Sequence, residues 1–402
     1  MTTNAKDSLD GKNLLIKISG PDHPGITARL MKIVSENNTP VLDIGQSVTH
    51  GLLSLSFVLK IGENCASSDH VIKELLFESY KMGMTLDYKV VETLLDTILS
   101  DEEKFILNCV APSNITPHFI RDISSTLAKH DVNILRIDKV SPNEFTSLEI
   151  LTIVPTSIDH KKLKEELIGV SNTHKIDIAF LKDNVFRRSK RLIVFDMDST
   201  LIQAEVIDEL AKAHGVGKEI SEVTEQAMNG ELDFNQSLIK RVSMLKGLDA
   251  TVMHDILEKL PLTQGVEEFV QTIKKLGYKV AIISGGFTYF ANALKERLKL
   301  DYAFANELEI IDGKLTGNVL GTIVNAEQKA ILVSLIAQQE NISLEQVVAI
   351  GDGANDLPML SQAGLGIAFH AKDIVKKAAQ NHMSHGPMTS ILYFLGIPGS
   401  LK

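Results

Sequence analysis

The stretch LIVFDMDST, residues 192–200, places four apolar residues directly before two aspartates. The residues from Leu192 to Phe195 do not alternate with polar ones, which is typical of a strand that is buried on both faces of a sheet. Parallel sheets covered by helices contain such strands, so this stretch predicts an α/β domain. Asp196 and Asp198 would then stand at the carboxyl end of the strand.

Two more short apolar runs follow the same plan further along the chain. Residues 279–283 lead into SGG at 284–286, and residues 347–350 lead into GDGAND at 351–356. Ligands bind at the carboxyl ends of strands in open α/β sheets, so we expect the three polar clusters to converge. A single aspartate after a strand is more often a helix N-cap, but three such clusters favour a shared site.

The converging clusters would crowd four carboxylates into one place. Carboxylates at such a distance repel one another unless a cation lies among them, and the four are Asp196, Asp198, Asp352 and Asp356. Oxygen ligands without histidine or thiol favour Mg²⁺ over zinc. The sequence therefore predicts a magnesium site at this edge of the sheet.

The alternation of strands and helices is interrupted after the first strand. Residues 203–262 are helical in pattern and rich in Glu, Lys and Met, which indicates a helical cap inserted over the sheet at about residues 203–265. Residues 310–315 carry an Asp-Gly pair between apolar residues and predict a hairpin. We expect one capped α/β domain over residues 190–402.

The part of the chain before this domain contains one pattern twice. Residues 12–95 read as strand, helix, two strands, helix and strand, and the same order returns in residues 104–181. This βαββαβ order is typical of ferredoxin-like domains, and its repetition predicts two similar modules. We place them at residues 11–97 and 103–182. Residues 182–190 are polar and basic, and we interpret them as a solvated linker or a domain boundary rather than a nucleic-acid patch.

Composition limits the class of protein. The chain has 402 residues, enough for two or three domains, and 41 Lys+Arg against 51 Asp+Glu give a net charge of −10. This acidity argues against nucleic-acid binding, and two cysteines cannot form a disulfide framework. The opening MTTNAKDSLD lacks the apolar core of a signal peptide, and no run of roughly 18 apolar residues occurs. We therefore expect a cytoplasmic protein that does not enter a membrane.

Four motifs resemble the signature of the haloacid dehalogenase (HAD) superfamily of phosphotransferases. DMDST at 196–200 fits its D-x-D-x-T motif and GDGAND at 351–356 its fourth motif, with Ser284 and Lys329 at the second and third. Lys329 alone would be interpreted as a solvated helix residue. Within the superfamily, residues 191 to about 395 resemble the phosphoserine phosphatases on DMDSTLIQAE, ELDFNQSLIKRV, SGGF and GDGANDLPML. This resemblance implies a HAD-like Rossmannoid parallel sheet with a helical cap.

The resemblance also implies a mechanism. Asp196 would attack the phosphate and form an aspartyl-phosphate, while Asp198 would protonate the leaving oxygen and then deprotonate water. The carboxylates of Asp196 and Asp352 and the backbone carbonyl of Asp198 would hold Mg²⁺, and Lys329 would offset negative charge. The other implied groups hold the phosphate or order the site, and they are Ser284, Gly285, Asn355, Asp356 and Thr200.

Four residues of the predicted cap match positions that recognise the substrate in this family. Glu205 would hold the ammonium group and Arg241 the carboxylate of O-phospho-L-serine. Met228 and Phe234 match apolar positions that close over it. Without the resemblance, the charged pair would be interpreted as surface groups and the apolar pair as core of the cap. The implied products are L-serine and phosphate, in the last step of L-serine biosynthesis.

The two N-terminal modules resemble ACT domains, which bind amino acids and pair through their sheets. In the first module the loop GPDHPGI at 20–26 supports this, and Gly20, Asp22 and Gly25 are candidate ligand-binding residues. The second module has APSNI at 111–115 instead, which suits a structural or dimer-forming role. We expect regulation by L-serine and a homodimer formed through the ACT domains. The alternative is a pair of modules that serves dimerisation alone.

Two further functions stay open. The same chemistry could act on a related phosphorylated amino acid such as phosphohomoserine, or transfer the phosphoryl group to another hydroxyl. A sensor of amino acids whose phosphatase half has decayed is the other reading. The intact set of catalytic residues argues against the sensor, because decay usually removes a nucleophile first.

Overall fold

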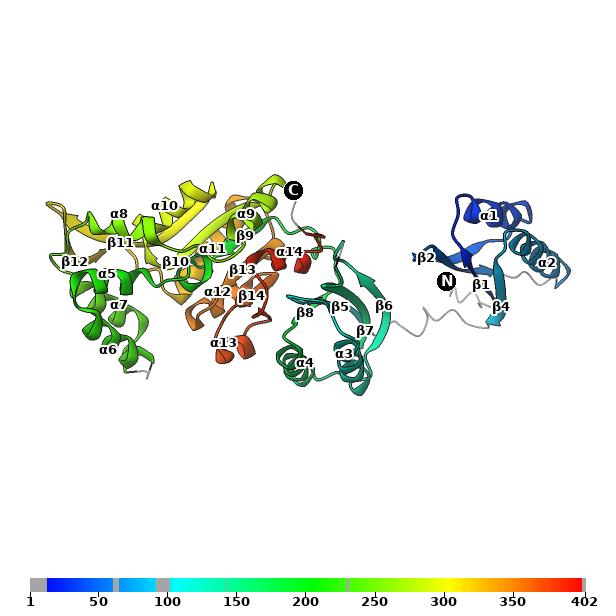
Figure 1. The fold of residues 1–402 in the computed structure, drawn as a ribbon, viewed down its shortest axis with the longest axis horizontal. Helices are drawn as coiled ribbons and strands as arrows, with labels where there is room; N and C mark the ends of the chain where they lie inside the picture. The colour runs from blue at the N-terminus through cyan, green and yellow to red at the C-terminus, as the bar shows by residue number, and fades with distance from the viewer. Residues whose placement is uncertain (1–12, 61–64, 92–101, 143, 229–230, 400–402) are drawn as a thin grey trace, which may run out of the picture. The chain divides into compact units, whose positions relative to one another are not determined.

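The computed structural model describes residues 13–60, 65–91, 102–142, 144–228 and 231–399. The chain falls into two compact units, residues 1–101 and residues 102–402. Figure 1 labels most of the helices and strands of both. Each unit is considered by itself.

The first unit is a βαββαβ module with a four-stranded antiparallel sheet. Its elements are β1 (Asn13–Pro21), α1 (Ile26–Glu36), β2 (Val41–Thr49), β3 (Leu52–Lys60), α2 (Cys65–Lys81) and β4 (Thr85–Val91). The strands lie in the order β2-β3-β1-β4. Buried and exposed residues alternate along β3, and its Leu55 and Phe57 share one core with Leu30 of α1 and Leu75 of α2.

The second unit begins with another module of the same topology. Its elements are β5 (Glu102–Val110), α3 (Pro117–Lys129), β6 (Asn133–Lys139), β7 (Ser147–Pro155), α4 (His160–His174) and β8 (Asp177–Lys182). The order β6-β7-β5-β8 repeats that of the first module strand for strand. The helices α3 and α4 lie side by side (Figure 1). The predicted internal repeat is confirmed.

The rest of the second unit is built on a seven-stranded sheet. Its strands are β9 (Leu192–Phe195), β10 (Lys279–Phe287), β11 (Tyr302–Ile311), β12 (Lys314–Leu320), β13 (Val347–Gly351), β14 (Leu365–Phe369) and β15 (Asn381–Met383). The order is β12-β11-β10-β9-β13-β14-β15, and every neighbouring pair is parallel except β11 with β12. β11 and β12 form the predicted hairpin, in which Asp312 and Gly313 both have positive φ.

Both faces of this sheet are buried, as the unbroken apolar runs predict. Along β9, Ile193 and Phe195 belong to one apolar cluster, whereas Leu192 and Val194 belong to another. The helices of this part are α9 (Val266–Lys275), α10 (Thr288–Leu298), α11 (Ala326–Gln339), α12 (Leu357–Gln362), α13 (Asp373–Ala378) and α14 (Ile391–Phe394). The polar residues after the strands therefore stand at the edge of a rigid, two-sided core.

Four of the helices that lie between β9 and β10 in the chain form the predicted cap. They are α5 (Val206–His214), α6 (Gly217–Met228), α7 (Phe234–Ser243) and α8 (Val252–Lys259). At the start of α7 the Asp233 carboxylate accepts the Gln236 N–H at 2.8 Å, and the Gln236 side chain accepts the Asp233 N–H at 3.1 Å. α6 contacts both α5 and α7, and Figure 1 shows the three helices grouped together.

The segment that follows the second module is exposed over residues 182–185 and at Arg188, as a solvated linker would be, but two of its cations are buried. Arg187 is 5% exposed and pairs with the Glu149 carboxylate of β7, and Lys190 is 7% exposed. These two charges are buried because the second module packs directly against the α/β sheet, which the composition of the segment does not reveal.

Asp177, buried at the first position of β8, ties the second module to this sheet. Its carboxylate accepts hydrogen bonds from the N–H groups of Ser384, His385 and Gly386 at 2.6, 3.1 and 2.9 Å. β8 itself lies against β15, the edge strand of the seven-stranded sheet. A single carboxylate thus holds three backbone groups of the loop that follows β15.

The architecture confirms the predicted fold class: a capped, largely parallel α/β sheet preceded by two βαββαβ modules. The domain limits 11–97, 103–182 and 190–402 stay predictions. Among the helices that the structure describes, none has both the length and the apolar content that a membrane crossing needs.

Candidate active site

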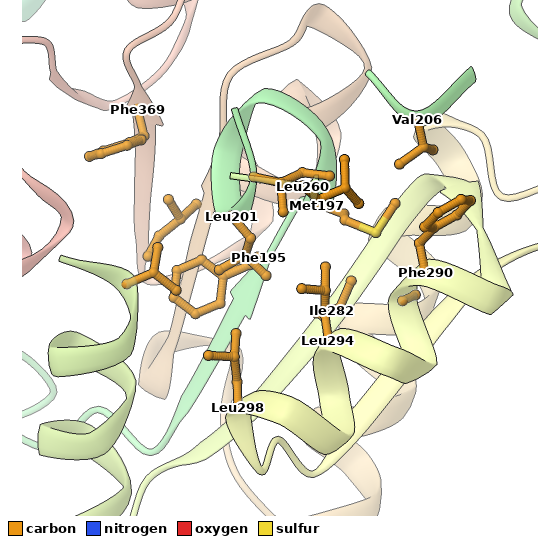
Figure 2. Close-up of a cluster of buried hydrophobic side chains, with 14 of the residues drawn as sticks. Phe195, Met197, Leu201, Val206, Leu260, Ile282, Phe290, Leu294, Leu298 and Phe369 are labelled. Atoms are coloured by element: carbon orange, nitrogen blue, oxygen red, sulfur yellow. The ribbon is translucent and has the colours of Figure 1, made fainter. Parts of the chain in front are cut away.

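Asp196 follows directly on β9, and a buried core fixes its position. Its N–H donates to the last-but-one carbonyl of β13 at 2.9 Å. The chain then turns sharply over residues 197–201, where Ser199 has a φ of 56°. Figure 2 shows Phe195 and Leu201 within a cluster of buried side chains that includes residues of β10 and α10. This apolar anchor holds the turn that presents the two aspartates.

Lys329 of α11 is completely buried and joins two carboxylates. Its ammonium group lies 2.5 Å from Asp196 Oδ1 and 2.6 Å from Asp356 Oδ1. Burial acts to lower the pKa of Lys329, but the two carboxylates outweigh burial and raise it, so the ammonium stays charged. Burial raises the pKa of Asp196 well above its usual range, although Lys329 opposes this shift. The Lys329 ammonium group therefore places one positive charge beside Asp196, but the carboxylates of the site still outnumber its positive charges.

Three carboxylates lie close enough together to share a metal ion. Asp196, Asp352 and Asp356 each offer one oxygen, and these oxygens lie within 4.8 Å of one another. Lys329 engages two of them, whereas Asp352 accepts a hydrogen bond from the Thr200 hydroxyl at 3.2 Å. Burial, and then the Asp356 carboxylate, raise the pKa of Asp352 to about 7. One ammonium group cannot balance these charges, so the donor set fits a divalent cation with oxygen ligands.

Asp198 is held by a backbone group and lies near Ser284. The Val206 N–H donates to Asp198 Oδ1 at 3.0 Å, and the Ser284 hydroxyl lies 3.5 Å from Asp198 Oδ2. Burial, and then the carboxylate of Glu205, raise the pKa of Asp198 to about 7. A carboxyl group with such a pKa can both give and take a proton near neutral pH.

The two glycines at the end of β10 allow a close approach of backbone and side chains. A Cβ atom at Gly286 would lie 2.5 Å from Asp198 Oδ2, and one at Gly285 would lie 2.9 Å from the Phe234 ring. The Gly286 N–H also donates to the Ser284 hydroxyl at 2.9 Å. The SGG motif therefore has a steric reason, because larger residues would push the strand end away from the aspartates and the cap.

A cavity of about 150 Å³ lies where the strand ends meet the cap. Most of the predicted site residues line it, and they are Asp196, Asp198, Glu205, Phe234, Arg241, Ser284, Gly285, Asp352 and Asn355. Lys329, Asp356 and Thr200 do not line it but are fully buried behind it. Pockets for drug-sized ligands are about 300 Å³ or more, so this cavity suits a small metabolite.

Glu205 and Arg241 bring opposite charges into the cavity from the cap. Glu205 accepts a hydrogen bond from the Ser199 hydroxyl at 2.7 Å, and Arg241 Nε donates to the Ser237 carbonyl at 3.3 Å. Burial raises the pKa of Glu205 and lowers that of Arg241. The side chain of Met228, at the end of α6, lies outside the described residues, so its predicted role stays a prediction.

Sequence analysis missed two asparagine contacts that brace the site. Asn306, buried in β11, donates to the Gly285 carbonyl and accepts the Val324 N–H, both at 2.8 Å. Asn325 caps α11 and donates to Asn235 of the cap at 3.2 Å. An amide in the otherwise apolar first half of β11 is the available signal, because a buried amide must find partners.

The candidate regulatory residues lie between β1 and α1 of the first unit. Gly25 precedes α1 with a φ of 97°, and the Asp22 N–H donates to the Gly51 carbonyl at 2.8 Å. Gly20 has a packing reason, because a Cβ atom there would lie 2.6 Å from the Met84 sulfur. These contacts explain the shape of the loop, and ligand binding by it stays a prediction.

Family comparisons define the class of protein to which this fold and site correspond. Residues 190–364 match the haloacid dehalogenase-like hydrolases. Residues 12–89 and residues 109–181 each match ACT domains. The capped α/β part is thus a HAD hydrolase domain, and the two βαββαβ modules are ACT domains.

Individual relatives narrow this class. The phosphoserine phosphatase of Streptomyces coelicolor is 38% identical over 394 residues, which cover 98% of this chain and 94% of that protein. The crystal structure of a HAD family hydrolase from Salmonella enterica serovar Typhi is 34% identical, with a TM-score of 0.64 over 73% of this chain and 98% of the other. An unliganded probable phosphoserine phosphatase from Vibrio cholerae is 40% identical, with a TM-score of 0.58 over 74% and 87%. The chain belongs to the phosphoserine phosphatase family of HAD hydrolases.

Proposed function

We propose that this chain hydrolyses O-phospho-L-serine to L-serine and phosphate, with Mg²⁺, through an aspartyl-phosphate on Asp196. One observation carries the proposal: Asp196 and the oppositely charged side chains of Glu205 and Arg241 line the same small cavity. Lys329, which does not line the cavity, contacts Asp196. The acidic end of the cavity suits phosphoryl chemistry, and the charged pair suits an amino acid. The names of the relatives agree with this substrate.

The donor set supports Mg²⁺ as the cation. The carboxylates of Asp196 and Asp352 and the backbone carbonyl of Asp198 would hold it, and when bound it supplies positive charge for a phosphate dianion. Lys329 adds a second, permanent positive charge at the same carboxylate. Asp356, which accepts a hydrogen bond from Lys329, positions the lysine rather than the substrate.

The chain's own residues account for both half-reactions. A carboxylate oxygen of Asp196 attacks phosphorus as the bond from phosphorus to the serine oxygen breaks, and Asp198 gives its proton to that oxygen. Asp198 then takes a proton from water, whose oxygen attacks phosphorus and displaces the Asp196 carboxylate. The pKa of about 7 suits Asp198 to both steps. Ser284, the Gly285 N–H and Asn355 hold the phosphate oxygens.

Recognition of the amino-acid end falls to the cap. The planar fork of Arg241 matches a carboxylate, and the Glu205 carboxylate is the simplest partner for an ammonium group. Phe234 adds an apolar wall next to Gly285. The alternative substrate, phosphohomoserine, carries the same two charged groups on a longer chain, so only turnover can separate the two.

A panel of phosphate esters tests this function. Phosphate release is measured from O-phospho-L-serine, phosphohomoserine, phosphothreonine and 4-nitrophenyl phosphate, with Mg²⁺ and with a chelator. We expect the highest kcat/KM for O-phospho-L-serine, no release with the chelator, and no turnover in Asp196→Asn. The matched control is Asp312→Asn, an exposed carboxylate at a hairpin turn, which should keep full activity. A higher kcat/KM for phosphohomoserine would favour the alternative, and turnover by Asp196→Asn would overturn the nucleophile.

We also propose that L-serine regulates the enzyme by binding the first ACT domain, through the loop that contains Gly20, Asp22 and Gly25. The α1 N-terminus in this loop offers free N–H groups to a carboxylate. Feedback by the product suits an enzyme of the last step of L-serine biosynthesis in the cytoplasm. Calorimetry of the full chain with L-serine should show binding that Asp22→Ala weakens. Binding of equal strength in the variant would place the ligand elsewhere.

The first unit offers an apolar surface for the proposed homodimer. All nine positions of β2 are exposed, and Ile44 and Val48 are 48% and 47% exposed. Tyr88 and Val90 of β4 are exposed as well. β2 and β4 are the two edge strands of this sheet, and exposed apolar residues of this kind commonly mark an interface. Sedimentation should give a dimer that a double change, Ile44→Lys with Val48→Lys, converts to a monomer, and a dimer in both would exclude this surface.

A further inference from the structure

A second cavity, of about 440 Å³, lies between the second ACT domain and the HAD domain. One wall consists of residues from β5, α4 and β8, and the opposite wall includes Leu365 and Asn381, the first residues of β14 and β15. Asp196 and Asp352 follow β9 and β13, so they lie at the opposite, carboxyl end of the parallel strands of the same sheet. This cavity and the active site therefore lie at opposite ends of the strands of the sheet. The volume of the cavity is that of a small-molecule pocket.

The cavity has an aromatic side. Phe105 of β5 and Phe180 of β8 stack with their ring centroids 4.6 Å apart, and both line it. Phe394 of α14 and Leu365 of β14 line the opposite, HAD side. An occupant can thus bury an apolar or aromatic portion between the two domains.

The cavity also has an excess of positive charge. Its lining includes the cations Lys164, Lys182, Arg187 and Lys190 against the single carboxylate of Glu345. Lys182 pairs with Glu103 and Arg187 with Glu149, so two of these charges are balanced from outside the cavity.

The other two cations are held by neutral groups. The ammonium of Lys164 donates to the Ala379 carbonyl, and that of Lys190 donates to the Glu345 carbonyl at 2.6 Å. Burial lowers the pKa of Lys164, and lowers that of Lys190 to about 8 although Glu345 opposes the shift. Among the described residues, the Arg187 Nε also has no hydrogen-bond partner despite its burial. A bound anion would accept hydrogen bonds from these groups and balance their positive charge.

We propose that this interdomain cavity binds a small organic carboxylate that carries an aromatic or bulky apolar group. The carboxylate pairs with Lys164 and Lys190, and the apolar group lies against Phe105 and Phe180. Such a molecule contacts both domains at once, so its binding stabilises their packing. The site is distinct from the active site and from the loop of the first ACT domain.

The test uses the full chain and 4-fluorobenzoate as the probe, followed by the broadening of its ¹⁹F NMR signal. We expect saturable binding that weakens at least tenfold in Lys164→Met. The matched control is Lys161→Met, on the exposed side of the same helix, which should bind the probe as the unchanged chain does. Fluorobenzene, which has the ring without the charge, should bind at least tenfold more weakly.

Two further variants separate this site from others and keep the test decisive. Arg241→Met must leave probe binding unchanged, because loss there would place the carboxylate in the active site. Gln380→Trp, at the exposed rim of the cavity, should block the probe without disturbing a buried residue. Unchanged binding in both Lys164→Met and Gln380→Trp, or no binding at all, would overturn the proposal. Neither result would bear on the hydrolysis of phosphoserine.

Discussion

At the residue scale, the carboxylates of the site outnumber the positive charges that the chain itself supplies there. Asp196 needs a free carboxylate to attack phosphorus, yet burial alone would keep it protonated. Lys329 supplies one positive charge at 2.5 Å, and the neighbouring carboxylates of Asp352 and Asp356 call for at least one more. A divalent cation and the buried lysine together explain how an acidic cluster can attract a phosphate ester in a chain with a net charge of −10.

Arg241→Met should change specificity more than chemistry. The variant removes the partner of the substrate carboxylate but leaves the strand-end residues in place, so kcat/KM for O-phospho-L-serine should fall about 100-fold. The rate with 4-nitrophenyl phosphate, which has no carboxylate, should change by less than about threefold. The neighbouring Lys240→Met, on the exposed side of α7, is the control. An equal loss with both esters would assign Arg241 to phosphate instead.

The strand-end carboxylates could be predicted from sequence, but the state of Lys329 could not. Asp196 and Asp352 stand directly after apolar runs, and the topology of parallel sheets brings such positions together. A lysine is among the residues least often buried, so only the motif order suggested a role for Lys329. Its complete burial between two carboxylates is a property of the packed domain.

At the scale of elements, β8 and the loop after β15 act as one unit through Asp177. Asp177→Ala removes the acceptor of three backbone N–H groups in a buried place, so the free energy of unfolding should fall by about 2–4 kcal/mol. Asp177→Asn keeps one oxygen and should lose less. Denaturant unfolding measures both, with the exposed Asp183→Ala as the control. Equal stability of all three variants would show that the clamp contributes nothing.

His382 of β15 gives the same interface a dependence on pH. Burial, and then the charges of Lys376, Lys164 and His385, lower its pKa from 6.5 to about 4. The unfolded chain therefore binds a proton that the folded chain does not, and stability present above pH 6.5 is lost as the pH falls towards 4.

The expected effect is measurable by unfolding at two pH values. Between pH 7 and pH 5 this group should remove about 2 kcal/mol from the free energy of unfolding. His382→Gln cannot take up the proton, so its loss over the same interval should be smaller by that amount. Identical pH profiles for the two chains would contradict the assignment.

Sequence patterns were sufficient to predict the helices and strands, but they were not sufficient to predict the contacts between them. Periodicity predicted the strands, the cap and the repeated module, because each depends on local patterns of burial. The burial of Arg187 was missed because a basic, polar stretch is usually solvated, and this burial follows from the partner Glu149 on β7. Asn306 escaped notice since its two backbone partners come from distant parts of the chain.

At the scale of the whole molecule, the described catalytic residues all lie in the second unit. Residues 1–101 form a separate compact unit, so their removal should leave kcat for O-phospho-L-serine within about threefold of the full chain. The shortened chain should lose the response to L-serine. Steady-state assays of both chains at matched concentrations check this. Inactivity of the shortened chain, with its fold intact by circular dichroism, would mean that the first unit completes the site.

The central claim is that the phosphoryl group passes through Asp196. Rapid mixing of the enzyme with ³²P-labelled O-phospho-L-serine and Mg²⁺, followed by acid quench, measures phosphate bound to the protein. We predict a transient protein-bound phosphate that hydroxylamine releases and that maps to the peptide containing Asp196, with none in Asp196→Asn. Full turnover without any protein-bound phosphate, or a label on a different residue, would contradict the account.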